Sequence, residues 1–328
     1  MTLARMRVPV RTPRLHAPVA WLCVVPIVAA CGGAPRFDRT VTDAHFCAPP
    51  HAWRLGDLGA PSNPAGDRPS EAVAATYSKS NVETARAIGA LPLLDRLAKL
   101  QMAKASDDEL LPVRQEIDDE IAFAELDLES AGAELGCETG RAEHVAIALK
   151  DADGDQVRDL TVLSLTVSAT AAVVSGILTA RNGSAVANGT AGVAGGVIGG
   201  GLGVGALLVN HTTRFMHPRN LLRDVWLAPA HTELIPAPVW TYLMSPQFGP
   251  GGETAIRDNI VLLWRQSGRL GGDPENPDPA LIALYFGEGG DYDADELERR
   301  ATMLSEVLSS MNLMHQELRE LAAEVWRR

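Results

Sequence analysis

Cysteine thiols are the most reactive side chains in this chain of 328 residues. The sequence contains four of them, at Cys23, Cys31, Cys47 and Cys137. A thiol can be acylated, can bind a metal or can form a disulfide, and its surroundings decide which of these happens. Two small residues, Ala29 and Ala30, precede Cys31, whereas Trp21 and Leu22 precede Cys23. Small residues are typical of the positions before a signal-peptide cleavage site, so processing is expected next to Cys31 and not next to Cys23.

Carboxylates alternate along the run Asp151, Asp153 and Asp155, which continues to Asp159. Alternating Asp side chains can surround Ca²⁺ with oxygen ligands. However, the run has its glycine at the fourth position instead of the sixth, and Val162 stands at the twelfth, where a calcium loop has Glu. We expect the Asp151–Asp159 stretch to be a solvated acidic collar, with weak calcium binding as the alternative.

The other residue types that carry chemistry do not form a catalytic motif. His211 and His217 are six positions apart, a spacing that places them on different faces of a helix. His315 lies within an apolar helical pattern, which indicates a packed histidine and not a ligand. The stretch from Gly201 to Ala206 matches a dinucleotide fingerprint, but no predicted strand precedes it. The sequence therefore predicts no metal, no cofactor and no enzymatic activity.

The first thirty residues have the composition of a targeting segment. A basic start is followed by an apolar stretch from Ala17 to Ala30. Its end, Val28-Ala29-Ala30-Cys31, resembles the lipobox of bacterial lipoproteins. The resemblance implies that residues 1–30 are a signal peptide and that Cys31 is lipidated; an ordinary secretory signal is the alternative. Gly32 follows the cysteine and, by the same resemblance, favours the outer membrane facing the periplasm, with the inner membrane as the alternative.

The net charge bears on the partners of the processed chain, and its two remaining cysteines bear on a disulfide. Removal of residues 1–30 takes away four arginines and no acid, so the formal charge of −12 becomes −16. Such an acidic chain is not expected to bind nucleic acid. Cys47 and Cys137 would share an oxidising compartment, which favours a disulfide between them. A bridge there would close the base of the helical hairpin predicted below.

Helical patterns dominate the region after a Pro/Gly-rich tether at 31–69. The region 70–159 is expected to be a long helical hairpin: one helix over 81–105, bent or split at Pro92, and a second that begins near Asp107. The second carries apolar residues at alternating intervals of four and three, which is the pattern of helices that pack lengthwise. Its seam is Ile117, Ile121, Ala124, Leu128, Ala131, Leu135, Ala142, Val145 and Leu149. Glu138 interrupts this seam, and Gly132, Gly136 and Gly140 leave a bare line for a close neighbour.

The region 160–209 is expected to be an apolar membrane hairpin. Residues 160–180 contain no charged residue and would span about 31 Å as a helix, close to the thickness of a hydrocarbon core. Arg181 stands in the turn, and a glycine-rich arm follows it. Two glycine lines in this arm allow close helix packing in lipid. They consist of Gly192, Gly196 and Gly200, and of Gly195, Gly199 and Gly203.

This combination of a lipobox and a glycine-rich hairpin resembles the glycine-zipper outer-membrane lipoproteins. The resemblance covers the lipobox and about fifty residues, and only the second arm is glycine-rich here. A soluble hairpin of small residues inside a helical bundle is the alternative. Arg214, Arg219 and Trp226 place residues 210–250 in a Pro-rich interfacial segment.

The last region, 251–328, is expected to be a C-terminal helical domain. It has helices over 253–267 and from a capping box at Asp293 and Glu296 to about Arg327. The seam of the last helix is Leu297, Ala301, Leu304, Leu308, Met311, His315, Leu318, Ala322 and Val325.

The sequence as a whole predicts an all-α, coiled-coil-like envelope protein. Its expected role is structural or scaffolding, through contact with the lipid bilayer and with a second copy or another envelope membrane protein. An α-helical pore-forming protein is the alternative, and an enzyme of unknown type is a more distant one.

Overall fold

The structure is a computed structural model that describes residues 43–48, 68–180 and 211–328, with residues 156 and 158–180 described by their backbone alone. Residues 36–153 and 210–328 form one compact unit, and residues 154–209 belong to a second. Lipidation at Cys31 lies outside the described residues, as do the six packing glycines Gly192, Gly195, Gly196, Gly199, Gly200 and Gly203.

The described part of the chain is mostly helical, as predicted. The helices are α2 (Glu71–Thr76), α3 (Lys79–Ala87), α4 (Leu91–Met102), α5 (Asp107–Ala180), α7 (Leu221–Leu227), α8 (Ala237–Met244), α9 (Ile256–Gln266), α10 (Pro279–Phe286), α11 (Ala294–Asn312) and α12 (Met314–Arg327). Short 3-10 turns cover Pro246–Phe248 and Pro250–Gly252. Two strands, β1 (Thr213–Met216) and β2 (Gly289–Tyr292), complete the fold.

The helix predicted over 81–105 is split, and its two halves are α3 and α4. Gly89, with φ of 81°, lies in the connection, and Pro92 is the second residue of α4, within its first turn. A proline fits the first turn because no intrahelical hydrogen bond is needed there. The split leaves α4 only 12 residues long, about 18 Å, so the predicted pair of long helices is not present.

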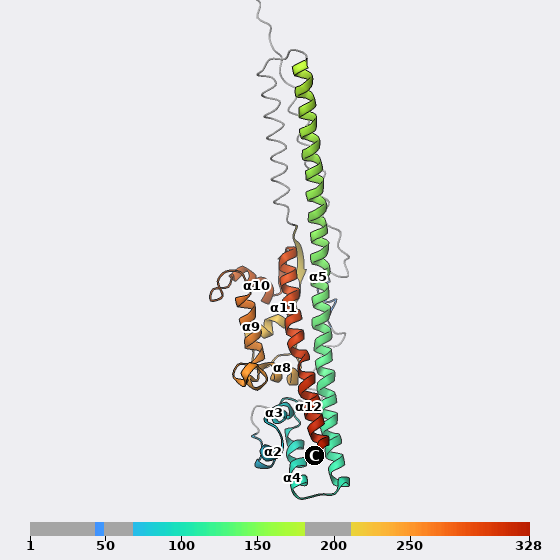
Figure 1. Cartoon of the computed structure of the whole chain (residues 1–328), viewed down its shortest axis with the longest axis vertical. Coiled ribbons are helices and arrows are strands. Elements are labelled where there is room, and N and C mark those ends of the chain that lie inside the picture. The colour runs from blue at the N-terminus through green and yellow to red at the C-terminus, as the bar shows by residue number, and fades with distance from the viewer. Residues whose placement is uncertain (1–42, 49–67, 181–210) are drawn as a thin grey trace, which may run out of the picture. The chain divides into compact units, whose positions relative to one another are not determined.

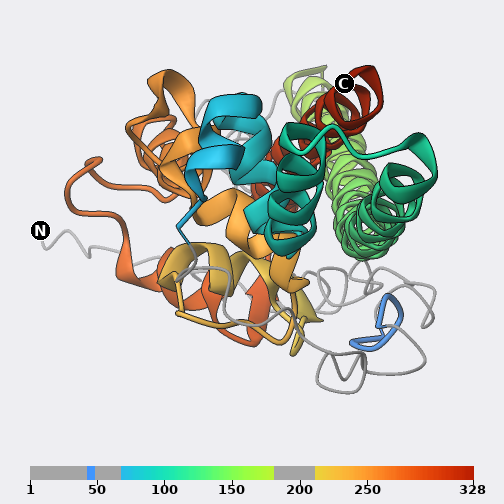
Figure 2. The same ribbon diagram turned by 90° about the horizontal axis from the view of Figure 1, so that it is seen from below.

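Helix α5 is the longest of the described helices. Helices α11 and α12 follow one another along it and run antiparallel to it (Figure 1). Lys150 of α5 pairs with Glu298 at the start of α11, and Asp118, in the first turns of α5 after Pro112, accepts from the indole of Trp326 at the end of α12. Every residue of the predicted α5 seam is buried in the core. Seen from below, the short helices gather on one side of α5 (Figure 2). The heptad-like pattern therefore identified the face that packs.

Glycines on α5 admit the close neighbour that their spacing predicted, and this neighbour is Leu308 of α11. A Cβ atom built on Gly132 would lie 3.3 Å from the Leu308 side chain, and one on Gly136 would lie 4.0 Å from it. A Cβ atom on Gly140 meets nothing within 4 Å. Gly132 and Gly136 therefore allow the close approach of α11, whereas Gly140 has no close neighbour.

We expect Gly140→Ala to stabilise the fold and Gly132→Ala to do so less or not at all. Alanine favours a helix interior over glycine by about 1 kcal/mol, and Gly140 has room for the methyl group. At Gly132 the same gain is opposed by contact with Leu308. Urea unfolding of the two variants measures the difference, and a larger gain at Gly132 would show that α11 moves away freely.

The seam of the last helix differs from its prediction at Leu308, which is partly buried beside the fully buried Val307, and again beyond Met311. Helix α11 begins with the predicted capping box of Asp293 and Glu296, but the chain tightens at Leu313, where the amide of Gln316 bonds to the Leu313 carbonyl. The tighter turn moves the buried positions to Met314 and Leu321. His315 and Ala322, which the regular seam would bury, are therefore only half-buried.

A small antiparallel ribbon was not predicted. Strand β1 pairs with β2, with Thr213 opposite Tyr292 and Met216 opposite Gly289. Gly289 has φ of 105°, and a Cβ atom there would overlap the carbonyl of Phe215. Such long-range pairing leaves little trace in the local sequence.

The ribbon joins the 210–250 segment to the C-terminal region, and α8 of that segment packs on α3 and α9 in the same core.

The structure describes only the first part of the segment 160–209, for which a membrane hairpin was predicted. Residues 160–180 are helical, as the last part of α5, and residues 181–210 lie outside the described part. Within the residues that the structure describes, no helix has both the length and the hydropathy of a membrane-spanning segment.

Candidate functional site

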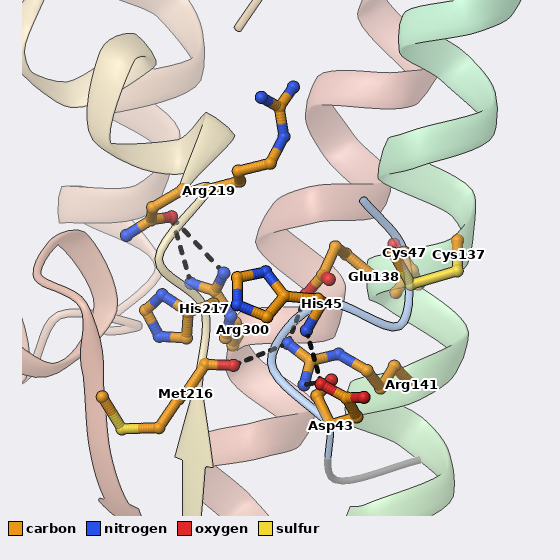
Figure 3. A network of polar contacts seen from close by, with 12 residues as sticks. Asp43, His45, Cys47, Cys137, Glu138, Arg141, Met216, His217, Arg219 and Arg300 are labelled. Carbon is orange, nitrogen blue, oxygen red and sulfur yellow. Dashed lines mark hydrogen bonds and ion pairs between the residues drawn. A yellow bond between two sulfur atoms is a disulfide. The ribbon is translucent and has the colours of Figure 1, made fainter. Parts of the chain in front are cut away.

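Buried charge is concentrated where α5, α11 and the β1–β2 ribbon meet (Figure 3). Five buried polar residues gather there: Glu138, Arg141, His217, Asn220 and Arg300. Two of them are guanidinium groups and only one is a carboxylate. Since burial of an unpaired charge is costly, the partners of each cation decide what this cluster does.

Arg141 of α5 connects three segments of the chain. Its Nη2 atom lies 2.8 Å from Glu138 Oε2 and donates to the Met216 carbonyl of β1 at 2.9 Å. Its Nη1 atom donates to the Asp43 carbonyl at 3.2 Å. The guanidinium also lies over the ring of Phe215, 3.9 Å from the ring centre. Arg141 thus fixes β1 and the 43–48 segment to α5.

The predicted disulfide between Cys47 and Cys137 is present, one turn before Arg141 on α5, with the two Cα atoms 5.6 Å apart. Its expected place at the base of a hairpin was wrong. Cys137 is thirty residues, about 45 Å, along α5 from Asp107, whereas α4 covers only about 18 Å of that length. The bridge instead holds the 43–48 segment beside β1, near the middle of the compact unit.

Arg300 of α11 stabilises the carboxyl end of helix α10. Its Nη1 atom donates to the Tyr285 carbonyl at 3.0 Å, and the amide of Asn220 donates to the carbonyls of Tyr285 and Gly287. The Tyr292 hydroxyl donates to the Leu284 carbonyl at 2.8 Å. The last carbonyls of a helix lack intrahelical partners and form the negative end of its dipole. These carbonyls offset part of the cost of burying the Arg300 cation, although burial still lowers the pKa of its guanidinium group.

His217 lies between these two arginines and is a neutral donor. Its Nε2 atom is 2.9 Å from the Tyr292 oxygen, whose own proton points to Leu284. Among the described residues, Nδ1 has no hydrogen-bond partner, so the proton is assigned to Nε2. Burial and the positive charge of Arg300 lower the pKa of His217 to about 2. An imidazole with this pKa is not suited to general acid–base catalysis near neutral pH.

The other residues singled out from the sequence lie apart from this cluster. Residues 151–159 are helical, as part of α5, which corrects the idea of a calcium loop. Asp153 accepts from the backbone and the ring of His211 instead, and His211 does not approach His217. No group of three or more potential metal ligands occurs in the described part of the chain. Arg219 points away from the cluster (Figure 3). Its guanidinium pairs with Glu134 instead.

One feature of the sequence indicates this cluster, namely the spacing of Glu138 and Arg141. Glu138 interrupts an otherwise apolar seam and is followed three positions later by Arg141, a spacing that permits an ion pair on one helix face. Arg300 and Asn220 gave no comparable signal, because the α10 carbonyls that they contact come from distant parts of the chain.

The hydrogen bonds of the cluster are made mainly to backbone carbonyls, at Asp43, Met216, Leu284, Tyr285 and Gly287. Its chemistry is that of a structural clamp, which holds a ribbon, a helix end and a disulfide-linked segment around α5. Comparison with protein-family models, with curated proteins and with solved structures gives no match.

Proposed function

We propose that this chain is a lipid-anchored protein of the bacterial cell envelope with a structural or scaffolding role. The observation that carries the proposal is the Cys47–Cys137 disulfide, because it links the predicted tether at 31–69 to α5, the longest of the described helices. Structural disulfides persist in oxidising compartments such as the periplasm. The bridge therefore supports export, in agreement with the lipobox-like sequence at Cys31.

The position of the bridge also suits an anchored protein. Cys31 and Cys47 are sixteen positions apart, so a lipid at Cys31 could lie at most about 53 Å from the bridge along an extended chain. Without the bridge, the first fixed element after the lipid would be α2, forty positions away at Glu71 and up to about 130 Å distant. The disulfide would thus keep the folded unit close to the membrane surface.

The clamp supports a mechanical role and not a chemical one. The cations Arg141 and Arg300 hold backbone carbonyls, and His217 is kept neutral by its surroundings. Arg141 fixes the 43–48 segment and β1 to α5, Arg300 fixes the end of α10 to α11, and His217 bonds to Tyr292 of β2. A scaffold that is held through one end of its chain needs such fixation at the point of attachment.

The membrane part of the proposal is tested with the glycine lines. We expect Gly196→Leu combined with Gly200→Leu to decrease crosslinked assemblies while the membrane content stays constant, because bulk separates helices yet adds hydrophobicity. Gly201→Leu, outside both lines, is the matched control. Normal association of the double variant, or its loss from membranes, would contradict association through the glycine lines.

The anchor is tested with Cys31→Ser. We expect the acyl label to disappear while carbonate washing still leaves the protein in the membrane fraction, since the hairpin is a second anchor. Retention of the acyl label would contradict lipidation at Cys31, and release by carbonate would contradict insertion of the hairpin.

A further inference from the structure

Helix α5 exposes two neighbouring large apolar side chains, Phe123 and Leu126, on the side away from its seam. Phe123 is 65% exposed and Leu126 is 61% exposed, although the opposite side of this part of α5 is packed in the core. Residues three apart on a helix are neighbours on its surface, so these two side chains form one patch. Ala122 and Ala133 extend it along the same side and are also exposed.

Carboxylates surround this patch. The remaining helix-surface neighbours of Phe123 are Asp119, Glu120 and Asp127, and Glu129 follows Leu126 by three positions. Between Arg114 and Arg141 the sequence contains nine acidic residues and no lysine or arginine. Within the described part of the chain, none of the four carboxylates around the patch forms an ion pair, whereas Glu116, Glu134 and Glu138 each do.

A hollow adjoins the patch and shares Asp127 with it. The hollow is lined by Asp127, Ser130, Ala131, Glu134, Arg219, Glu233, Leu234 and Pro236. Three of these side chains are carboxylates, and the single cation, Arg219, is already paired with Glu134. Burial raises the pKa of Asp127, which shows that this carboxyl is partly desolvated without a compensating cation.

We propose that the Phe123–Leu126 face of α5 binds a basic amphipathic helix of a partner protein. The apolar side of such a helix would cover Phe123 and Leu126, and its lysine or arginine side chains would reach the carboxylates, with one entering the hollow at Asp127. A second copy of α5 would bring like charges together, and an anionic membrane would be repelled by them. This inference does not rest on the membrane association proposed above, because all of its residues belong to the compact unit of residues 36–153 and 210–328.

The test uses the full chain in nanodiscs of zwitterionic lipid, with empty discs as the blank. The probe is a labelled amphipathic helical peptide made of leucine and lysine, and fluorescence anisotropy measures its affinity. We expect Phe123→Ser and Asp127→Asn each to weaken binding by about tenfold, which is a usual loss when a side chain at the centre of an interface is replaced. Leu313→Ser and Glu275→Gln, which change an exposed leucine and an exposed carboxylate elsewhere, are the matched controls and should bind as the unmodified chain does.

Three results would overturn the proposal. The first is equal affinity for the unmodified chain and the Phe123→Ser variant. The second is equal binding of a peptide in which glutamate replaces every lysine, because charge complementarity would then play no part. The third is a dimer in sedimentation that Phe123→Ser dissociates, since this would assign the face to a second copy. Circular dichroism melting verifies that each variant is folded, which is expected because Phe123 is exposed and Asp127 is only partly buried.

Discussion

Glu138→Gln is expected to lower the free energy of unfolding by about 3 kcal/mol, as for other buried ion pairs that lose one partner. Glu138 is buried and is the only carboxylate of the clamp, where it faces Arg141 at 2.8 Å. The substitution preserves the size of the side chain but leaves the buried cations Arg141 and Arg300 without a counter-charge. Chemical denaturation measures the loss as a lower midpoint with an unchanged slope.

The control is Glu134→Gln, one turn earlier on the same helix. Glu134 also pairs with an arginine, Arg219, at 2.9 Å, but the Arg219 side chain is 28% exposed while that of Arg141 is fully buried. Solvent screens the more exposed pair, so the loss should be below about 1 kcal/mol. Equal losses in the two variants would contradict the view that burial makes the Glu138–Arg141 pair important.

The sequence predicted those features that depend on neighbouring residues. The α5 seam from Ile117 to Leu149 follows from a regular spacing of apolar residues, and all of its members are buried. The capping box at Asp293 and Glu296 needs only a four-residue pattern. Both features are decided within a few turns of one helix, where periodicity and side-chain chemistry act directly.

Features that depend on distant contacts were missed or misplaced. The β1–β2 ribbon joins residues more than seventy positions apart, and its glycine-rich strand has no strand-like pattern of its own. Arg300 is buried because it faces the end of α10, which no local pattern of α11 reveals. The disulfide could be predicted from the number of cysteines, but its place required knowing that α3 and α4 are short.

Interpretation of Glu138 shows the same limit within the site. The sequence presents it as an interruption of the seam, whereas the structure shows that the seam is continuous and that Glu138 occupies a buried position in it. A charged residue within an apolar seam is costly unless a partner lies nearby, so it indicates a second buried charge. Arg141 at the next turn supplies that charge, and the carbonyls of Met216 and Asp43 complete its contacts.

The second large effect is a loss of stability in mild acid that His217 causes. The native pKa of His217 lies near 2, well below the value of 6.5 for an ordinary histidine. The unfolded chain therefore binds a proton below about pH 6.5 that the native chain does not, and stability falls as the pH decreases from 6.5 toward 2. The stabilising contribution is fully present above pH 6.5. For one such group, the loss between pH 7.5 and pH 5 is about 2 kcal/mol.

The charged groups that face His217 favour its neutral form, so its contribution to the stability of the fold decreases when the pH falls. Arg300 and Arg141 are positive and oppose its protonation, and burial acts in the same direction. The neutral ring already donates a hydrogen bond from Nε2–H to the Tyr292 oxygen, so protonation would not be needed to form it. Protonation in the folded chain would add a third buried cation beside one carboxylate. The folded chain consequently responds to acid by unfolding and not by taking up this proton.

His217→Gln separates this effect from general acid denaturation. A glutamine amide nitrogen can take the place of Nε2 and donate to Tyr292, but it does not titrate. We expect the variant to lose about 2 kcal/mol less than the unmodified chain between pH 7.5 and pH 5, measured by urea unfolding at each pH. His144→Gln, which removes an exposed imidazole from α5, serves as the control for the substitution itself. Parallel pH profiles for the unmodified chain and His217→Gln would mean that the clamp opens to admit the proton, so that His217 is not held neutral by its neighbours.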